Sequence, residues 1–300
     1  MIIRSTPPGR SISREHSQAS GVRSVIARMF ILSLFISLIP VDTSAQGNLL
    51  ITPRRVVLEG SKRSFDLNLA NIGQDSATYA ISLVQIRMTD DGGFETITGP
   101  DPGQRFADRY VRYFPRSVTL GPNESQVVKI QLVRTNELSA GEYRSHFYFR
   151  AVPKIRPLGE TDTSQDTSSF SVKLTPIFGI TIPVIIRSGE TSVNVKLTDL
   201  SLKLEDDTDP RLSIVFNRSG NMSVYGDLTV DHISPQGNVT RVGIANGVAV
   251  YTPNMIRRFQ FNLNRVQGVD FRSGTLRVIF SAPSDVKPVR YAEGELTLQK

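Results

Sequence analysis

Few residues of this sequence could support catalysis. It contains no cysteine and only three histidines, His16, His146 and His232. The missing thiols exclude disulfides, thiolate metal sites and cysteine nucleophiles. No phosphate-binding glycine loop, His-Glu-x-x-His zinc motif or Gly-x-Ser-x-Gly nucleophile motif occurs. The acidic run at 206–209 could offer oxygen ligands to calcium, but it lacks the EF-hand spacing and fits a solvated turn better. We therefore predict that the protein is not an enzyme and holds no metal or other cofactor.

The basic residues are the next chemical feature, and the N-terminus accounts for part of them. The formal charge is +7, from 35 basic and 28 acidic residues. Residues 29–41 form an apolar run of 13 residues, preceded by Arg23 and Arg28 and followed by the small residues Thr43, Ser44 and Ala45. This order is typical of a secretory signal peptide cleaved after Ala45, and the run is shorter than the roughly 20 residues that cross a bilayer. The alternative interpretation is a buried core helix.

Removal of the expected leader lowers the net charge of the protein, and with it the support for a nucleic-acid partner. Residues 1–45 carry five arginines and two acidic residues, so the remaining 255 residues keep a net charge of +4. A mild excess of this size gives little support to a nucleic-acid partner. We expect an exported, periplasmic protein with no stable membrane insertion after cleavage.

From Leu49 onward, apolar residues alternate with polar ones. Turn signals separate these stretches at 59–60, 71–73, 90–93 and 121–123. Short strands between Gly, Asn, Asp and Pro turns predict β-sandwiches, and no stretch shows a long helical period. We expect strands at 118–120, 126–133 and 142–152, a polar loop at 154–169, and a second set at 193–197, 212–217, 223–233, 247–251, 258–263, 274–280 and 294–298.

Residues 170–189 are the most unusual segment. Apolar side chains of one parity run from Phe170 to Ile186, and Pro183 lies among them. Proline cannot donate a ladder hydrogen bond, so this strand is expected at a sheet edge, where it could pair with another chain. We place the domains at 46–188 and 189–300, after the signal peptide at 1–45.

Four segments resemble the periplasmic pilus-assembly chaperones of the PapD-like family. They are Ile51–Gly60 (ITPRRVVLEG), Tyr113–Pro122 (YFPRSVTLGP) with the QVVKI that starts at Gln126, Leu138–Pro153 (LSAGEYRSHFYFRAVP) and Phe170–Arg187. The match covers about 140 residues of the first domain, and the second domain matches mainly in class and size.

The resemblance implies an all-β fold of two immunoglobulin-like sandwich domains in an L-shaped arrangement. It also implies donor-strand complementation, in which an edge strand of the chaperone completes a pilus subunit that lacks its last strand. Alternate side chains of that strand would fill the subunit groove. By alignment these are Val172, Leu174 and Phe178, with Ile180 also possible, whereas Ile182, Val184 and Ile186 are interpreted as the protein's own core.

The resemblance further implies two basic residues that bind the C-terminal carboxylate of the subunit. The first maps to Arg55, with Arg54 as its neighbour, and only one of them can face the cleft because adjacent strand residues point to opposite sides. The second, a lysine in the family, aligns with Pro183. Arg187, or less favourably Lys173, would have to replace it.

The function expected from this resemblance is a periplasmic chaperone that stabilises pilus or fimbrial subunits and delivers them to an outer-membrane usher. A self-capping dimer through the edge strand is a further possible partner state. The alternative is an immunoglobulin-like structural or adhesive protein with no client.

Overall fold

The computed structural model describes residues 48–153, 177–205, 209–284 and 286–298. The expected signal peptide, the acidic run at 206–208, and Val172 and Leu174 lie outside these residues. Within the described part every regular element is a strand or a short 3-10 helix. No helix in that part combines the length and the apolar character needed to cross a membrane.

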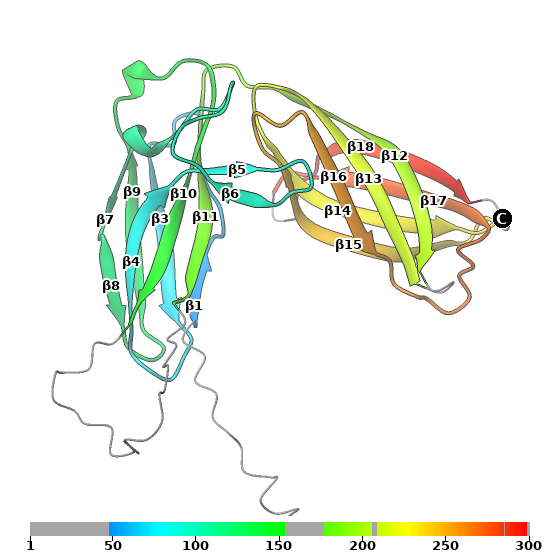
Figure 1. Ribbon diagram of the computed structural model, residues 1–300, viewed down its shortest axis with the longest axis horizontal. Coiled ribbons are helices and arrows are strands. Elements are labelled where there is room, and N and C mark those ends of the chain that lie inside the picture. The colour runs from blue at the N-terminus through cyan, green and yellow to red at the C-terminus, as the bar shows by residue number, and fades with distance from the viewer. Residues whose placement is uncertain (1–47, 154–176, 206–208, 285, 299–300) are drawn as a thin grey trace, which may run out of the picture. The chain divides into compact units, whose positions relative to one another are not determined.

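The first sandwich consists of two facing sheets (Figure 1). One has the order β1-β3-β9-β7, and the other has the order β2-β11-β10-β4-β8. The strands are β1 (Leu49–Thr52), β2 (Val56–Leu58), β3 (Ser64–Asn71), β4 (Ala77–Val84), β7 (Val111–Phe114), β8 (Ser117–Leu120), β9 (Ser125–Leu132), β10 (Gly141–Val152) and β11 (Gly179–Ser188). Two short 3-10 helices, η1 (Asp108–Tyr110) and η2 (Thr135–Glu137), lie in its connections.

The second sandwich is built in the same way from a sheet of order β12-β13-β16 and a sheet of order β15-β14-β17-β18. Its strands are β12 (Val193–Glu205), β13 (Asp209–Gly220), β14 (Val224–Ile233), β15 (Val239–Val250), β16 (Ile256–Asn262), β17 (Gly274–Ser281) and β18 (Arg290–Leu298). The prediction of an all-β protein with two immunoglobulin-like sandwiches is confirmed.

Each sandwich has its own hydrophobic core, and alternation along the strands explains both. In β9, for example, Val128 and Ile130 are buried while the residues between them face outward. Ile182, Val184 and Ile186 of β11 lie in the core of the first sandwich, as interpreted from the sequence. Two-residue periodicity thus predicts which side chains face inward.

The predicted strands of the second sandwich are all present, although several are longer than expected. β12 continues from Val193 to Glu205, past the end predicted at Leu197. Its pairing register with β13 shifts between Thr198 and Ser201. A bulge of this kind interrupts the alternation that a sequence pattern follows, so the pattern ended too early.

The first strand of the chain changes sheets, which corrects the expected position of β11. β1 pairs with β3, and after Pro53 the chain crosses to the other sheet, where β2 pairs in parallel with Val184–Ile186. β11 is therefore an edge strand only in its first half. The expectation that the whole strand lies at an edge is wrong for its second half.

A hairpin of β5 (Ile86–Met88) and β6 (Phe94–Thr96) extends from the first sandwich to the second (Figure 1). The Arg258 N–H donates to the Asp90 carbonyl at 2.6 Å, and the Asn254 amide donates to the Met88 carbonyl at 2.8 Å. The turn at 90–93 was predicted, but its short flanking strands were not. This hairpin holds β16 beside the first sandwich.

Candidate functional site

The first half of β11 has an open side. β10 pairs with β11 from Gly179 to Ser188, whereas β2 covers only Val184–Ile186. Within the described part of the chain, Gly179–Pro183 has no strand on its second side. Unpaired backbone groups on such an edge are a template for another strand.

The hydrogen-bond pattern shows which backbone groups face the open side. The Ala151 N–H donates to the Phe178 carbonyl at 2.9 Å. Since alternate residues direct their backbone groups to opposite sides, Gly179, Thr181 and Pro183 present theirs to the open side. Pro183 has no N–H, and because it faces the open side, the pairing of β11 with β10 loses no hydrogen bond.

The side chains before β11 are apolar and exposed. Ile177 is 52% exposed and Phe178 46%, and Ile180 is partly buried against the core. Phe178 and Ile180 therefore lie on the strand whose edge is open, next to the protein's own core. The other two expected donor residues, Val172 and Leu174, lie outside the described residues.

The opposite face of the same sheet contacts the second sandwich, and the strand register determines which side chains lie there. β2 aligns Val57 with Ile185, and β10 aligns Arg144 with Ile185 and His146 with Pro183. Paired residues share a face, so Arg144 and His146 point toward the second sandwich. Arg55, two residues before Val57, points the same way, and Arg54 is exposed.

Arg55 lies against two aromatic rings. Its guanidinium carbon is 4.4 Å from the centre of the Tyr225 ring and 5.5 Å from that of Tyr251. Both terminal nitrogens are buried, and neither has a hydrogen-bond partner among the described residues. Such stacking stabilises the charge but leaves the N–H donors unused, and these donors could bind an anion.

Arg144 lies on the same tyrosine. Its guanidinium carbon is 4.4 Å from the Tyr251 ring centre. Nη1 donates to the Ile86 carbonyl at 3.3 Å and Nη2 to the Thr252 carbonyl at 3.1 Å, while the buried Nε has no partner among the residues that the structure describes. Burial lowers the pKa of Arg144, and the charge of Arg55 lowers it further. We call Arg55, Arg144, Tyr225 and Tyr251 the arginine–tyrosine cluster.

His146 is uncharged in the folded protein at neutral pH. Burial, together with the charges of Arg144 and Arg55, lowers the pKa of His146 from 6.5 to about 3. A nearby anion would oppose this shift, because it would favour the protonated imidazole. The low pKa therefore reflects burial first, and the positive charges of Arg144 and Arg55 second.

Arg187 belongs to a different arrangement, in which every nitrogen has a partner. Nε donates to Glu142 at 3.3 Å, Nη1 to Glu59 at 3.1 Å and Nη2 to the Ser223 carbonyl at 3.1 Å. The Glu142 carboxylate also accepts bonds from the Ser223 N–H at 2.9 Å, the Ser223 hydroxyl and the Thr252 hydroxyl. We call Glu142, Arg187, Ser223 and Thr252 the carboxylate joint, because it ties the sandwiches together.

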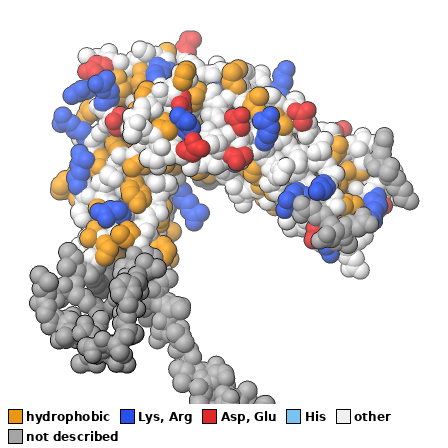
Figure 2. All heavy atoms as spheres, viewed as in Figure 1, with side chains coloured by type: hydrophobic (Ala, Val, Ile, Leu, Met, Phe, Trp, Pro, Cys, Tyr) orange, Lys and Arg blue, Asp and Glu red, His pale blue; other side chains and the backbone are white. Residues whose placement is uncertain are grey.

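On the face shown in Figure 2, the surface charges do not form a second candidate site for an anion beside the arginine–tyrosine cluster. Basic and acidic side chains of the described residues are interspersed there, so the net positive charge is not gathered into one basic surface on that face.

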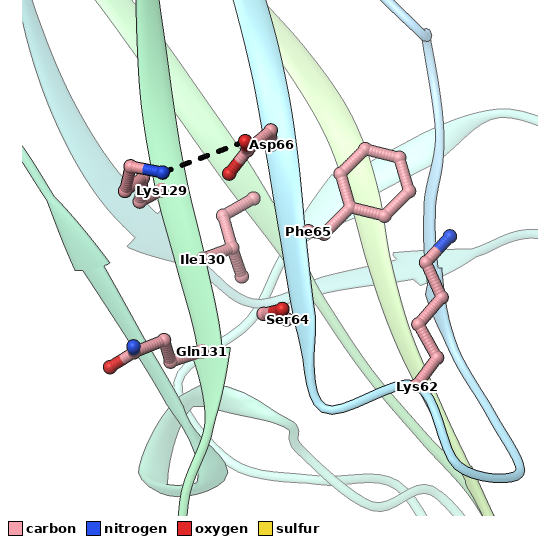
Figure 3. Close-up of a pocket in the computed structure, with 7 residues that line it drawn as sticks. All are labelled: Lys62, Ser64, Phe65, Asp66, Lys129, Ile130 and Gln131. Carbon is pink, nitrogen blue, oxygen red and sulfur yellow. Dashed lines mark ion pairs between the residues drawn. The ribbon is translucent and has the colours of Figure 1, made fainter.

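A cavity of about 520 Å³ lies on the first sandwich, lined by Lys62, Ser64, Phe65, Asp66, Lys129, Ile130 and Gln131 (Figure 3). The Lys129 ammonium pairs with the Asp66 carboxylate at 3.6 Å, and the Lys62 ammonium lies 4.2 Å from the Phe65 ring centre. The charged groups at this cavity are thus already partnered, and the rim is exposed. Among the described residues no group of three or more His, Asp or Glu is placed to hold a metal ion.

The structure separates the expected site residues. Phe178 and Ile180 have the parity that faces the core of the first sandwich, whereas Arg55 contacts Tyr225 and Tyr251 on the opposite face and Arg187 lies in the carboxylate joint. Sequence reasoning missed Arg144, Tyr225 and Tyr251. Arg144 could have been found, because it shares the parity of His146 on a predicted strand, whereas the two tyrosines come from distant segments.

No protein-family model matches the chain, and no curated protein matches it. The chain is similar to solved structures of pilus chaperones. The YadV chaperone is 13% identical, with 84% of this chain and 100% of that chain covered and a TM-score of 0.41. The CupB2 chaperone of Pseudomonas aeruginosa is 14% identical, with 83% and 100% covered and a TM-score of 0.40.

A third similar structure is the CsuC–CsuE chaperone–tip adhesion subunit pre-assembly complex from archaic chaperone-usher Csu pili of Acinetobacter baumannii. It is 10% identical, with 84% of this chain and 99% of that chain covered and a TM-score of 0.41. Likenesses at this level do not transfer an activity. The strand edge and the arginine–tyrosine cluster are the features from which a function has to be derived.

Proposed function

We propose that this protein is a periplasmic chaperone that binds pilus or fimbrial subunits through the first half of β11 and delivers them to an outer-membrane usher. The observation that carries the proposal is the open side of Gly179–Pro183, which continues into the exposed Ile177 and Phe178. Main-chain pairing along an open edge supplies affinity, and alternate apolar side chains supply register. Export to the periplasm rests on the expected signal peptide.

The proposed donor residues are Val172, Leu174, Phe178 and Ile180. Each apolar side chain buried in a subunit groove would contribute roughly 1.5–3 kcal/mol. Phe178 has almost half of its surface available for this, because it lies beyond the part of β11 that the protein's own core covers.

We propose that the C-terminal carboxylate of the subunit binds to the unused N–H donors of Arg55, with Arg144 as the second cation. Both guanidinium groups lie on Tyr251, and no carboxylate is hydrogen-bonded to either of them among the described residues. Arg187 is left out of this pair because all three of its nitrogens donate to protein oxygens. Arg54 is left out because it is exposed.

The test is co-expression in the periplasm with a pilus subunit from the same genome, followed by size-exclusion chromatography. We expect a one-to-one complex with the unaltered protein and none with Phe178→Asp, because a carboxylate would be buried in the subunit groove. Ile177→Asp is the matched control, since its side chain is equally exposed but points to the other face.

Complex formation by Phe178→Asp would contradict the donor role of this strand. If the unaltered protein binds no subunit and elutes as a dimer, its edge is covered by a second copy. If it binds none and elutes as a monomer, the immunoglobulin-like protein without a client is the better description.

A further inference from the structure

A cavity of about 250 Å³ lies beside the open half of β11, on the side of the second sandwich. Thr181 and Pro183 of β11 form one wall, and Met88 of the β5–β6 hairpin forms another. Tyr251 and Arg257 close it from the second sandwich. No member of the carboxylate joint lines it.

Three aromatic rings surround this cavity. The ring centres of Phe94 and His146 are 6.2 Å apart, those of Phe94 and Tyr251 6.3 Å, and those of His146 and Tyr251 6.3 Å. Phe94, the first residue of β6, is 58% exposed although its side chain is large and apolar. We call Phe94, His146, Tyr251 and Arg257 the aromatic pocket.

The electrostatics of the aromatic pocket select among possible occupants. His146 is neutral, as its low pKa shows, and among the described residues the buried Nε of Arg257 has no hydrogen-bond partner, whereas Nη1 donates to the Ala249 carbonyl. A cationic side chain would be repelled by Arg257. A carboxylate would find one buried unused N–H there, against two terminal nitrogens at Arg55, and would lose its hydration among three rings. An aromatic ring avoids both costs, because it packs edge-on against other rings and its face attracts a guanidinium.

We propose that the aromatic pocket binds one aromatic side chain of the polypeptide that pairs with the open half of β11. The geometry favours this occupant because Thr181 and Pro183 belong both to the open edge and to the pocket wall. Directly opposite residues of paired strands lie about 5 Å apart and share a face, so a side chain of the added strand reaches the pocket. This inference rests on the proposed function for the identity of that polypeptide.

The test uses a small probe that does not need the strand edge. N-acetyl-phenylalaninamide is titrated into the full chain labelled with ¹³C at the methionine methyl groups, and N-acetyl-lysinamide is titrated in parallel. Met88 is buried in the pocket wall, and the exposed Met255 does not line the pocket, so the two methyl signals provide a reporter and a reference. We expect the phenylalanine amide to shift the Met88 signal, and the lysine amide to leave it unchanged.

Two variants check that the shift comes from this pocket. Phe94→Ala removes one ring and should weaken the phenylalanine amide about three- to tenfold. Phe114→Ala, which removes an exposed phenylalanine that does not line the pocket, should leave the affinity unchanged. Thr181→Phe should abolish the Met88 shift by filling the cavity from β11.

An unchanged Met88 signal, or an equal shift with the lysine amide, would overturn the aromatic pocket while leaving strand pairing untouched. The Met88 shift should persist in Phe178→Asp, because the probe does not pair with the edge. If the protein binds the probe but binds no pilus subunit, the aromatic pocket is supported and the proposed function is refuted.

Discussion

The carboxylate joint and the arginine–tyrosine cluster lie on the same face of one sheet, yet their charges are satisfied to different degrees. In the joint, Glu142 accepts four hydrogen bonds and each nitrogen of Arg187 donates one. In the cluster, three buried guanidinium nitrogens of Arg55 and Arg144 have no hydrogen-bond partner in the part of the chain that the structure describes. A network whose donors and acceptors are all paired holds the two sandwiches together, whereas N–H donors that have no partner can bind a ligand.

The largest effect is expected at the carboxylate joint. Glu142→Ala should lower the free energy of unfolding by about 3–5 kcal/mol, because it leaves Arg187 and the buried Ser223 and Thr252 hydroxyls without their acceptor. Urea denaturation measures this. Glu59→Ala is the control: Glu59 also pairs with Arg187 but is 55% exposed, so its loss should cost less than about 1 kcal/mol. Equal losses in the two variants would show that the joint is not the structural tie between the sandwiches.

The next effect is a dependence of stability on pH that originates at His146. The unfolded chain takes up a proton near pH 6.5, whereas the folded protein does so only near pH 3. The contribution is complete above pH 6.5 and is lost as pH falls toward 3, at about 1.4 kcal/mol for each pH unit. His146→Phe should flatten the denaturation midpoints between pH 6.5 and pH 4 relative to the unaltered protein. Parallel pH profiles for the two proteins would exclude this source.

The smallest effect on stability, and the sharpest on binding, is expected at the arginine–tyrosine cluster. Arg55→Ala should weaken subunit binding about ten- to hundredfold, because charged hydrogen bonds to the carboxylate are lost. The free energy of unfolding should fall by only about 1 kcal/mol, the value of the stacking on tyrosine. Isothermal titration calorimetry measures the affinity, with the exposed Arg54→Ala as the control.

A subunit with an amidated C-terminus sharpens this comparison. It should bind the unaltered protein at least as weakly as Arg55→Ala binds the normal subunit, because Arg144 also loses its partner, and Arg55→Ala should weaken it no further. Additive losses would instead place the carboxylate away from Arg55.

Alternation of apolar residues was sufficient to predict the all-β class, the strands of the second sandwich, several strands of the first and the inward side chains of β11, but not β5, β6 or β7. It was sufficient because a sandwich strand has one buried and one exposed face, so a two-residue alternation of apolar side chains indicates which of them are buried. The same rule separated Arg54 from Arg55, since neighbours on a strand face opposite sides. The C-terminal end of β12 was missed because a bulge breaks that period.

Contacts between segments that are distant in the sequence were decided only by the tertiary structure. The crossing from β1 to β2 divides β11 into a covered and an open half, and a local pattern does not contain that parallel pairing. Tyr225 and Tyr251 meet Arg55 and Arg144 across the two sandwiches, and this contact distinguishes the unused arginines from the fully bonded Arg187. The sequence by itself determined the strands and the parity of their side chains, because both are local. The partner of each charge depended on packing between strands more than one hundred residues apart.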